Sequence, residues 1–410
     1  MKKLLMTLSL FAVVASSAYA YKAGTVNVKA YPKSNMLISA EEAIKLIGKK
    51  NVMFVSGDSA DSYPNQHIKG SVEMGAHHLH HSNIMGEMHC APLYQCIEEA
   101  EHHIGEKGID NNTLVIAYDD YRGPNATGVY SFFKSYGHDN VKILMGGFKA
   151  IRALDPAQKQ YDALKEQAKK AGKPEKKATK KLGEYKKAVK RLEKAIADKD
   201  AKKTKKYQKV VDKGELSPAE KTKLEKVIAD SNAKVKAVEA KMAKVEKKLL
   251  VVKGEEVVTP KKYHINPKKV SYKSIVSKKD VLDAVKDIQK HGKRSKYVII
   301  DARGMIEIIG ERKMDNVARG GHIPGSTFLE WKHISDDKRG VAFKTAAELK
   351  EVFKKFGITK DKTIYAYCHV GAGRGSEVVS ALEIMGYKNA KVYTGSWDEW
   401  GNDMMLPIKR

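Results

Sequence analysis

The residues best suited to covalent chemistry are one cysteine and the glycine-rich segment that follows it. Cys368 ends an apolar run and is followed by glycines at positions 371, 373 and 375. Glycine permits backbone angles that other residues avoid, so consecutive N–H groups can point inward as a nest that holds an anion. A cysteine beside such a nest is expected as the thiolate, which is the nucleophilic form. The alternative is a buried structural cysteine, which needs no glycine-rich turn behind it.

Two predicted elements hold this turn. The β-branched and aromatic run at residues 363–367 indicates a buried strand, and residues 377–385 indicate a helix. The cysteine is therefore expected at a strand tip, where the positive end of the helix dipole favours a bound anion. The predicted substrate-binding residues are those of the turn itself: His369, Val370, Gly371, Ala372, Gly373 and Arg374.

Alternating strand-like and helix-like segments occur twice, in the N-terminal part and again near the C-terminus. This alternation predicts a parallel sheet covered by helices on both faces. Two motifs recur at matching places, so the chain is predicted to be a duplicated domain. The matching pairs are His67-Ile68-Lys69-Gly70-Ser71 with His322-Ile323-Pro324-Gly325-Ser326, and Gly146-Gly147-Phe148 with Gly395-Ser396-Trp397.

The expected elements can be given by their ranges. In the first series we expect helices at residues 39–47, 94–104 and 129–136, and strands at 52–55, 114–118 and 141–144. In the second series we expect helices at residues 279–290 and 346–356, and strands at 297–300 and 391–393, in addition to the strand and helix around the cysteine.

Both halves resemble rhodanese domains, and the pair resembles a tandem-domain thiosulfate sulfurtransferase of the rhodanese superfamily. The matching segments are Asp301-Ala302-Arg303, residues 321–326, the Cys368 loop and residues 393–400. The resemblance implies that Cys368 is the catalytic nucleophile and that Asp301 and Arg303 orient and bind the substrate. Trp397 and Trp400 are expected to serve packing.

The first half departs from this pattern. Asp119 stands where the second half has Cys368, and Val55-Ser56-Gly57 is predicted to replace Asp301-Ala302-Arg303. A carboxylate cannot replace a thiolate in sulfur chemistry. We therefore predict that only the second half is catalytic.

The resemblance implies transfer of a sulfane sulfur, without a cofactor, from a small anionic donor such as thiosulfate to a thiophilic acceptor. Two departures keep alternatives open. Glu307 lies where thiosulfate and mercaptopyruvate enzymes often have an arginine, and Arg374 is six residues after Cys368. That spacing is found in rhodanese-fold phosphatases and arsenate reductases. A non-catalytic sulfane-sulfur carrier would use the same cysteine.

Residues 155–262 match neither half. They hold 33 basic and 17 acidic residues, out of a net charge of +27 for the chain. An apolar seam that steps by four and three predicts a helix, and Ser217-Pro218-Ala219-Glu220 predicts a capping box at its start. The seam residues are Leu224, Ile228, Ser231, Val235, Val238, Met242, Val245 and Leu249.

A second seam lies upstream of this one, at Tyr185, Val189, Leu192 and Ile196, and Gly214 is expected to end its helix. The two seams together predict an antiparallel helical hairpin, a coiled coil inserted between the halves. We expect a spacer or docking arm without chemistry. The alternative is that its lysines bind an anionic partner protein or membrane surface.

The first 20 residues have the pattern of a secretory signal peptide, with Lys2 and Lys3 before an apolar stretch and Ala18-Tyr19-Ala20 as a cleavage site. We therefore expect a periplasmic protein that has no nucleic-acid partner. The predicted organisation is a signal peptide at residues 1–20, an inactive domain at 21–154, the hairpin at 155–262 and a catalytic domain at 263–410.

A cluster of histidines and cysteines stands out in the first half. A disulfide between Cys90 and Cys96 suits an oxidising compartment. Binding of copper, zinc or nickel is a second possibility, and no special role is a third. The cluster consists of His77, His78, His80, His81, His89, Cys90, Cys96, His102 and His103.

Overall fold

The computed structural model of the chain describes residues 21–22, 26–80, 96–214 and 216–410. The chain forms two compact units. One unit combines the chain up to Leu154 with Val251–Arg410, and the other is Asp155–Leu250. The first unit contains two similar α/β halves, and the second is entirely helical.

The first half is built on a five-stranded parallel sheet in the order β1-β6-β5-β2-β4. Its helices are α1 (Ala40–Ala43), α2 (Ala76–His80), α3 (Ile97–Glu106), α4 (Pro124–Ser135) and α5 (Gly147–Leu154). Its strands are β1 (Leu37–Ile38), β2 (Val52–Ser56), β3 (His67–Ile68), β4 (Val72–Glu73), β5 (Leu114–Tyr118) and β6 (Val141–Leu144), with β3 outside the main sheet.

The second half repeats this arrangement, with a parallel sheet in the order β10-β9-β11-β12-β8. Its helices are α9 (Lys278–His291), α10 (Met305–Ile308), α11 (Ala346–Lys355), α12 (Arg374–Ile384) and α13 (Ser396–Asn402). Its strands are β8 (Ile275–Val276), β9 (Tyr297–Asp301), β10 (Ser326–Phe328), β11 (Thr363–Tyr367) and β12 (Ala390–Tyr393). The strand β7 (Val251–Val252) pairs antiparallel with β3 of the first half.

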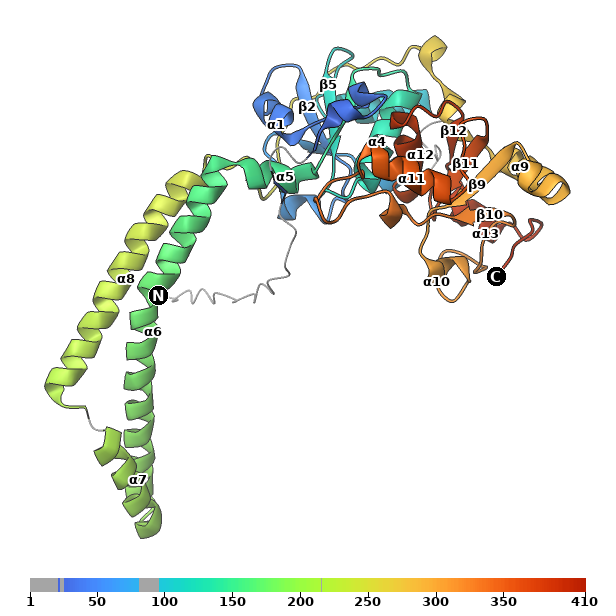
Figure 1. Ribbon diagram of the computed structural model, residues 1–410. Helices are drawn as coiled ribbons and strands as arrows, with labels where there is room; N and C mark the ends of the chain where they lie inside the picture. Colours follow the sequence, from blue (N-terminus) through green and yellow to red (C-terminus); the bar gives the residue numbers. More distant parts are fainter. Residues whose placement is uncertain (1–20, 23–25, 81–95, 215) are drawn as a thin grey trace. The chain divides into compact units, whose positions relative to one another are not determined.

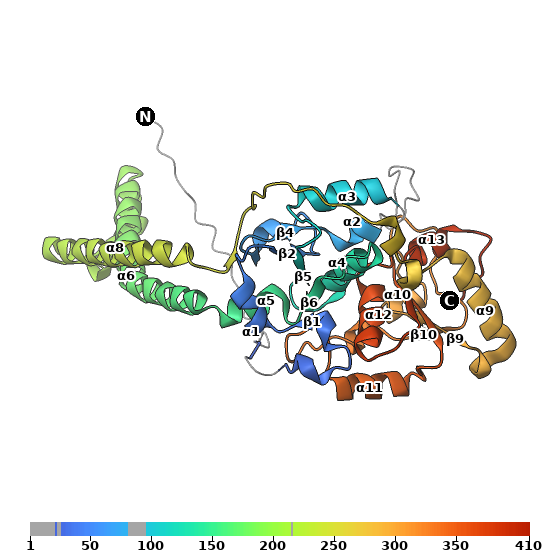
Figure 2. The same cartoon turned by 90° about the horizontal axis from the view of Figure 1, so that it is seen from above.

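Helices cover both faces of the second sheet, as the sequence predicted. Figures 1 and 2 both show the sheet between α12 on one side and α9 on the other. Val281, Ala284 and Val285 of α9 are buried in the core, because their spacing of three and four residues puts them on one helix face. A buried valine contributes about 1.5 kcal/mol or more, so this face fixes the helix on the sheet.

Matching hydrogen bonds confirm the predicted duplication. The Tyr367 hydroxyl accepts from the Ile323 amide at 3.0 Å and lies 3.3 Å from Ser326 Oγ. The Tyr118 hydroxyl makes the same contacts in the first half, with the Ile68 amide at 3.1 Å and Ser71 Oγ at 2.7 Å. The two histidine-containing motifs therefore occupy equivalent places in the two halves.

The two halves meet along α4 and α12, which lie side by side in Figure 2. Thr127 Oγ1 of α4 lies 3.4 Å from Ser376 Oγ of α12. A Cβ placed on Gly128 would lie 3.4 Å from the amide nitrogen of Gly373. The close approach brings the first half against the loop that carries Cys368.

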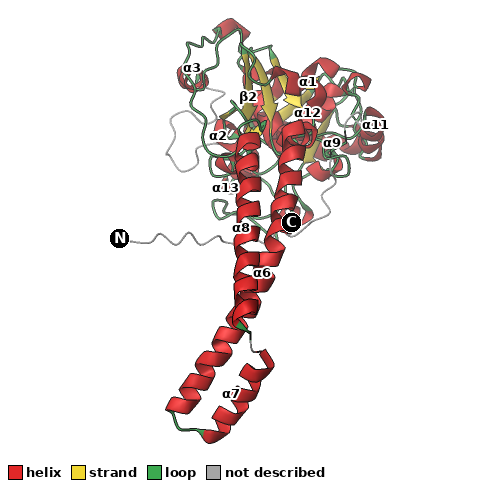
Figure 3. Cartoon of the chain, turned by 90° about the vertical axis from the view of Figure 1, so that its left-hand side faces the viewer, coloured by secondary structure: helices red, strands yellow, loops and turns green. Residues whose placement is uncertain are grey.

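The second unit consists of α6 (Pro156–Ala197), α7 (Ala201–Gly214) and α8 (Pro218–Glu246). Figure 3 shows α6 and α8 side by side, and Ser231 Oγ of α8 donates to the carbonyl of Ala171 in α6. The capping box is present, with the Glu220 amide donating to Ser217 Oγ at 3.2 Å. Seven of the eight predicted α8 seam residues lie within that helix and Leu249 lies just beyond it; all eight are buried or half-buried.

The predicted first arm of the hairpin is wrong in one respect, because it consists of two helices. Helix α6 ends at Ala197, and α7 returns along its distal part before ending at Gly214 (Figure 3). The turn has Lys199 at φ +53°, and Asp200 Oδ1 accepts from the Lys203 amide at 2.9 Å as a helix cap. The helical unit ends at Leu250, whereas the sequence predicted residue 262.

Candidate active site

Cys368 lies directly after β11, the central strand of the second sheet, and before α12. The carboxyl ends of parallel strands are where open α/β sheets carry their sites. Its side chain is a free thiol and is 2% exposed. The cysteine therefore lies in the loop between a buried strand and a helix N-terminus, as predicted.

The loop around the thiol depends on glycine at two places. Gly371 has φ +79°, and a Cβ at this position would lie 2.6 Å from the Thr394 Cα. Gly373 has φ +92° and precedes the first residue of α12. Because of these turns the loop curls around the sulfur, and Cys368 Sγ lies 3.7 Å from the Ala372 carbonyl oxygen.

Some amides of the predicted anion-binding nest already donate hydrogen bonds to acceptors within the protein. The Ala372 amide donates to the Val370 carbonyl at 3.0 Å, and the Gly373 amide donates to Ser376 Oγ at 2.9 Å. Within the described residues, the amides of His369, Val370, Gly371, Arg374 and Gly375 have no hydrogen-bond partner. These five amides are the donors that remain for a bound anion.

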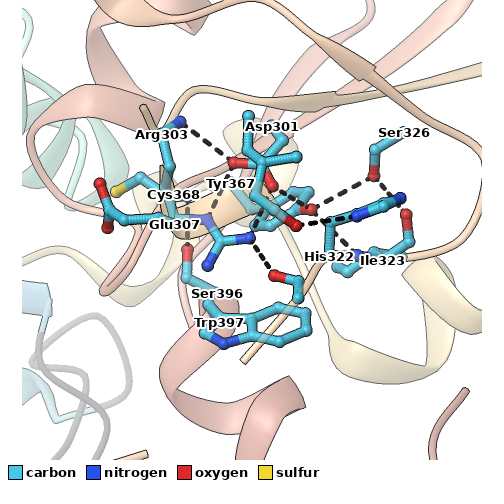
Figure 4. A network of polar contacts seen from close by, with 12 residues as sticks. Asp301, Arg303, Glu307, His322, Ile323, Ser326, Tyr367, Cys368, Ser396 and Trp397 are labelled. Carbon is cyan, nitrogen blue, oxygen red and sulfur yellow. Dashed lines mark hydrogen bonds and ion pairs between the residues drawn. The ribbon is translucent and has the colours of Figure 1, made fainter. Parts of the chain in front are cut away.

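Ser396 is a site residue that the sequence analysis noted only as part of a motif. Its hydroxyl accepts from the Cys368 amide at 3.1 Å and donates to the Tyr393 carbonyl at 2.8 Å (Figure 4). It is fully buried and has φ +52°, which is rare for a residue with a side chain. The next amides also hold the loop, since Trp397 donates to the Cys368 carbonyl and Asp398 to that of His369.

Arg374 is the first residue of α12 and is paired with Glu307 of α10. Its Nη1 lies 2.6 Å from Glu307 Oε2 and its Nη2 lies 3.1 Å from Oε1. Burial works to raise the pKa of Glu307, but the bond to Arg374 lowers it below the ordinary value. Both groups are therefore charged at neutral pH, and the arginine predicted to bind the substrate already has a carboxylate partner.

Asp301 and Arg303 form a second ion pair, which is completely buried. Arg303 Nε and Nη2 donate to the Asp301 oxygens at 2.9 and 2.7 Å (Figure 4). Arg303 Nη2 also donates to the Gly321 carbonyl. The guanidinium stacks 4.6 Å from the Trp397 ring, and the Tyr367 hydroxyl donates to Asp301 at 2.5 Å. These contacts position the end of β11; direct binding of substrate by Asp301 and Arg303 stays a prediction.

His369 follows the nucleophile and is half-buried beside the ion pair of Arg374. Burial, and then the charge of Arg374, lower the pKa of His369 to about 4. The imidazole is therefore neutral at physiological pH. It adds no positive charge to the mouth of the loop.

The first half also reaches this loop. His77 belongs to α2, and its Nε2 would lie 3.3 Å from a Cβ placed on Gly373. Of the histidine and cysteine cluster, His81, His89 and Cys90 lie outside the described residues. Cys96 is disulfide-bonded in the structure, and its pairing with Cys90 stays a prediction. The described residues contain no group of three or more side chains suited to a metal ion.

The equivalent loop of the first half is occupied by its own side chain. Asp119 follows β5 as Cys368 follows β11, and its Oδ2 accepts from the amides of Gly123 at 2.9 Å and Asn125 at 3.2 Å. The carboxyl group thus fills the position in which an anion would bind.

The strand register corrects the predicted match to Asp301-Ala302-Arg303. Ser56 pairs with Tyr118 as Asp301 pairs with Tyr367. The equivalent segment is therefore Ser56-Gly57-Asp58, one residue later than predicted. Matching the two halves by sequence cannot reveal this register, because strand pairing joins residues that are far apart in the chain.

Comparison with known proteins places the chain in a family. The sequence profile of the Rhodanese-like domain matches residues 39–154 and 282–403, which together exceed half of the chain. The protein therefore belongs to the rhodanese-like domain family, and the predicted resemblance is confirmed at this level.

Curated relatives match about one quarter of this chain. The sulfur carrier protein TtuD of Thermus thermophilus is 37% identical over 126 residues, which are 29% of this chain and 43% of the relative. A thiosulfate sulfurtransferase of Azotobacter vinelandii is 38% identical over 113 residues, which are 27% of this chain and 39% of the relative. The matches span about two fifths of the length of these relatives.

Solved structures share the fold over most of the chain. SseA from Escherichia coli, described with the rhodanese fold of 3-mercaptopyruvate sulfotransferases, has a TM-score of 0.54 and 18% identity, covering 88% of this chain and 98% of its own. The sulfur transferase subunit of yeast mitochondrial complex I has a TM-score of 0.57 and 17% identity, covering 91% and 99%. At these identities the likeness concerns the fold.

Proposed function

We propose that the protein is a sulfurtransferase that moves a sulfane sulfur from thiosulfate or a related donor to a thiophilic acceptor through a persulfide on Cys368. The observation that supports this most is the free Cys368 at the tip of the central strand, inside a loop with five available amides. Membership of the rhodanese-like family and the names of the curated relatives support the same chemistry.

In the first half-reaction the Cys368 thiolate attacks the outer sulfur of the donor. With thiosulfate, a bond forms between Cys368 Sγ and that sulfur, the S–S bond of thiosulfate breaks, and its electron pair leaves with sulfite. The amides of His369, Val370 and Gly371 hold the negative charge of the donor and then of the persulfide.

In the second half-reaction a thiophilic acceptor such as cyanide, sulfite or a thiol attacks the outer sulfur of the persulfide. The S–S bond breaks and Cys368 leaves as a thiolate, which restores the starting state. Electrons balance over the two steps without a redox cofactor. Ser396 keeps the Cys368 amide bonded throughout, so the nucleophile retains its position.

Steady-state turnover tests the assignment. Cys368→Ser should abolish transfer from thiosulfate to cyanide, because serine is a poor nucleophile toward sulfur. Asp119→Ala is the control at the equivalent place of the first half, and it should leave transfer nearly intact. Substantial turnover by the serine variant would overturn the proposal.

Two other functions are supported by particular observations. The name of the Thermus thermophilus relative favours a sulfur carrier, which would form the persulfide but would not turn over with small acceptors. The spacing of Cys368 and Arg374 favours a phosphatase or arsenate reductase, whereas the Glu307 pair at Arg374 opposes a phosphate dianion there. Aryl phosphate and arsenate, assayed in parallel, distinguish these activities.

We also propose that the chain is exported to the periplasm, on the pattern of residues 1–20. These residues lie outside the described part of the chain, and among the described helices none is long and apolar enough to cross a membrane. N-terminal sequencing of the protein from a periplasmic fraction should begin near Tyr21. Recovery only as the full-length chain in the cytoplasm would contradict export.

The lysine-rich helical unit is proposed to be a spacer or docking arm outside the catalytic chemistry. Its apolar seam faces inward, and its lysines are mostly exposed. An acidic partner protein or an anionic membrane surface would suit this charge.

A further inference from the structure

We propose that Glu307 selects the sulfur donor, disfavouring small dianions such as thiosulfate and favouring a persulfide carried on an organic thiol. This inference rests on the proposed sulfur transfer through Cys368 and names the donor class of that same site. The inference is based on the charged side chains around the loop and not on the nucleophile itself.

The first observation is the geometry of the Glu307 pair. Each Nη atom of Arg374 meets one carboxylate oxygen, at 2.6 and 3.1 Å, so the guanidinium presents its two-pronged edge to Glu307. The side chains are 25% and 14% exposed, so water weakens the pair only in part. A donor anion that uses this edge must displace or share the carboxylate.

The second observation is that two other candidates for a cation among the described residues of this half, Arg303 and His369, supply no free charge. The Arg303 guanidinium is buried against Asp301. His369 is neutral at physiological pH, because its pKa is lowered to about 4 by burial and by Arg374. Two arginines thus face two carboxylates, so neither arginine offers an unpaired cation to the donor.

Because the arginines are paired, the site should favour an uncharged donor group over a dianion. Thiosulfate brings two negative charges toward a thiolate, and the loop amides must offset this repulsion without an unpaired cation beside them. A persulfide attacked in its protonated form, R–S–SH, brings no charge on its sulfur atoms. The thiolate attacks its outer sulfur, a bond forms to Cys368 Sγ, the S–S bond of the donor breaks, and R–S⁻ leaves. The proton stays on the transferred sulfur, so atoms and electrons balance.

The surface beside Glu307 is consistent with an organic carrier. Met305 and Ile306, which precede Glu307 on α10, are 56% and 48% exposed, and Ile309 is 39% exposed. A small hydrated dianion gains nothing from these apolar side chains. An organic thiol that carries the sulfur can bury apolar surface against them.

Donor kinetics of the full-length protein test this inference. Glu307→Gln keeps the side-chain shape and removes its charge, and Glu307→Ala is a second variant in case glutamine still holds Arg374. The matched control is Glu348→Gln, because Glu348 makes the same two-pronged pair with Arg339, at 2.8 and 3.0 Å, away from the loop. The donors are thiosulfate and glutathione persulfide, with cyanide as the acceptor.

We expect Glu307→Gln to lower the KM for thiosulfate about tenfold, which is the size of one charged hydrogen bond released to the donor. The KM for glutathione persulfide should change less than about twofold, and Glu348→Gln should change neither. Equal effects on both donors, or no effect of either Glu307 variant, would overturn the role of Glu307. Absence of a Cys368 persulfide from both donors in the wild-type protein would instead overturn the proposed function.

Discussion

At the scale of single residues, the backbone of Ser396 is strained, and the hydrogen bonds of its side chain offset that strain. A residue other than glycine at φ +52° is strained by about 1 kcal/mol, yet this serine is fully buried against the nucleophile. Its hydroxyl is the partner of the Cys368 amide. A buried amide left without a partner costs about 1–3 kcal/mol, so the bond outweighs the strain.

This comparison predicts a ranking of two variants. Ser396→Ala keeps the strain and removes the hydroxyl, so we expect a loss of about 2 kcal/mol in the free energy of unfolding. Ser396→Gly also removes the hydroxyl but relaxes the backbone, so its loss should be smaller by about 0.5–1 kcal/mol. Urea unfolding measures both values. A larger loss for glycine than for alanine would contradict the strain.

At the scale of elements, helix α12 carries a carboxyl group that is buried without a hydrogen bond from the described residues to offset its desolvation. Glu377 is fully buried, and its two carboxylate oxygens have no hydrogen-bond partner within the described residues. Burial, and then the nearby Asp119, raise the pKa of Glu377 well above its ordinary value. The folded protein therefore keeps a proton there that the unfolded chain releases.

The sign of the resulting pH dependence follows from that difference. Above about pH 4.5, the ordinary value for glutamate, the unfolded chain binds fewer protons at this site, so stability falls as pH rises through the folded pKa. Glu377→Gln cannot ionise and should be more stable than wild type at pH 8 by at least about 1 kcal/mol, with a smaller difference at pH 5.

Thermal unfolding at pH 5 and pH 8 checks this prediction. Glu351→Gln, at an exposed position of α11, is the matched control and should leave the pH dependence unchanged. If Glu377→Gln destabilised the protein equally at both pH values, Glu377 would be ionised in the folded state.

The element boundaries show what could be predicted from the sequence. Strands β5 and β11 agree with their predicted ranges, because β-branched and aromatic runs identify buried strands. Helix α4 begins at Pro124 rather than at Val129, since Gly123 at φ +103° makes the turn and Pro124 takes the first helical position. Its first turn is rich in poor helix formers and is stabilised by contact with α12, which no local pattern reveals.

The candidate site was predictable to the same extent. The cysteine, its loop and the equivalent position of Asp119 could be identified because they depend on local sequence and on the repeat. The Arg374–Glu307 pair joins residues 67 positions apart, so it required the structure. The hydrogen bond from the Cys368 amide to Ser396 spans 28 positions and was missed for the same reason.

At the scale of the whole molecule, the helical unit is an insertion whose ends meet. The Leu250 amide donates to Asp155 Oδ2 at 2.9 Å, so the chain leaves and re-enters the α/β unit at nearly one place. Its apolar seam is buried within the unit itself. A short linker can therefore replace it without separating the two halves.

This arrangement predicts the effect of a deletion. Replacing residues 157–250 by a short glycine and serine linker should leave sulfur transfer within a few-fold of wild type. The melting transition of the α/β unit should also persist, because its core lies outside the deleted segment. A collapsed melting transition would show that the helical unit is needed for folding.

The measurement that tests the central claim most directly is the mass of the intact protein after incubation with a sulfur donor. If Cys368 accepts a sulfane sulfur, thiosulfate or glutathione persulfide should add the mass of one sulfur atom to the wild-type chain and not to Cys368→Ser. Cyanide should then remove it. No sulfur adduct from either donor, together with hydrolysis of an aryl phosphate that requires Cys368, would contradict the account and identify the loop as a phosphatase site.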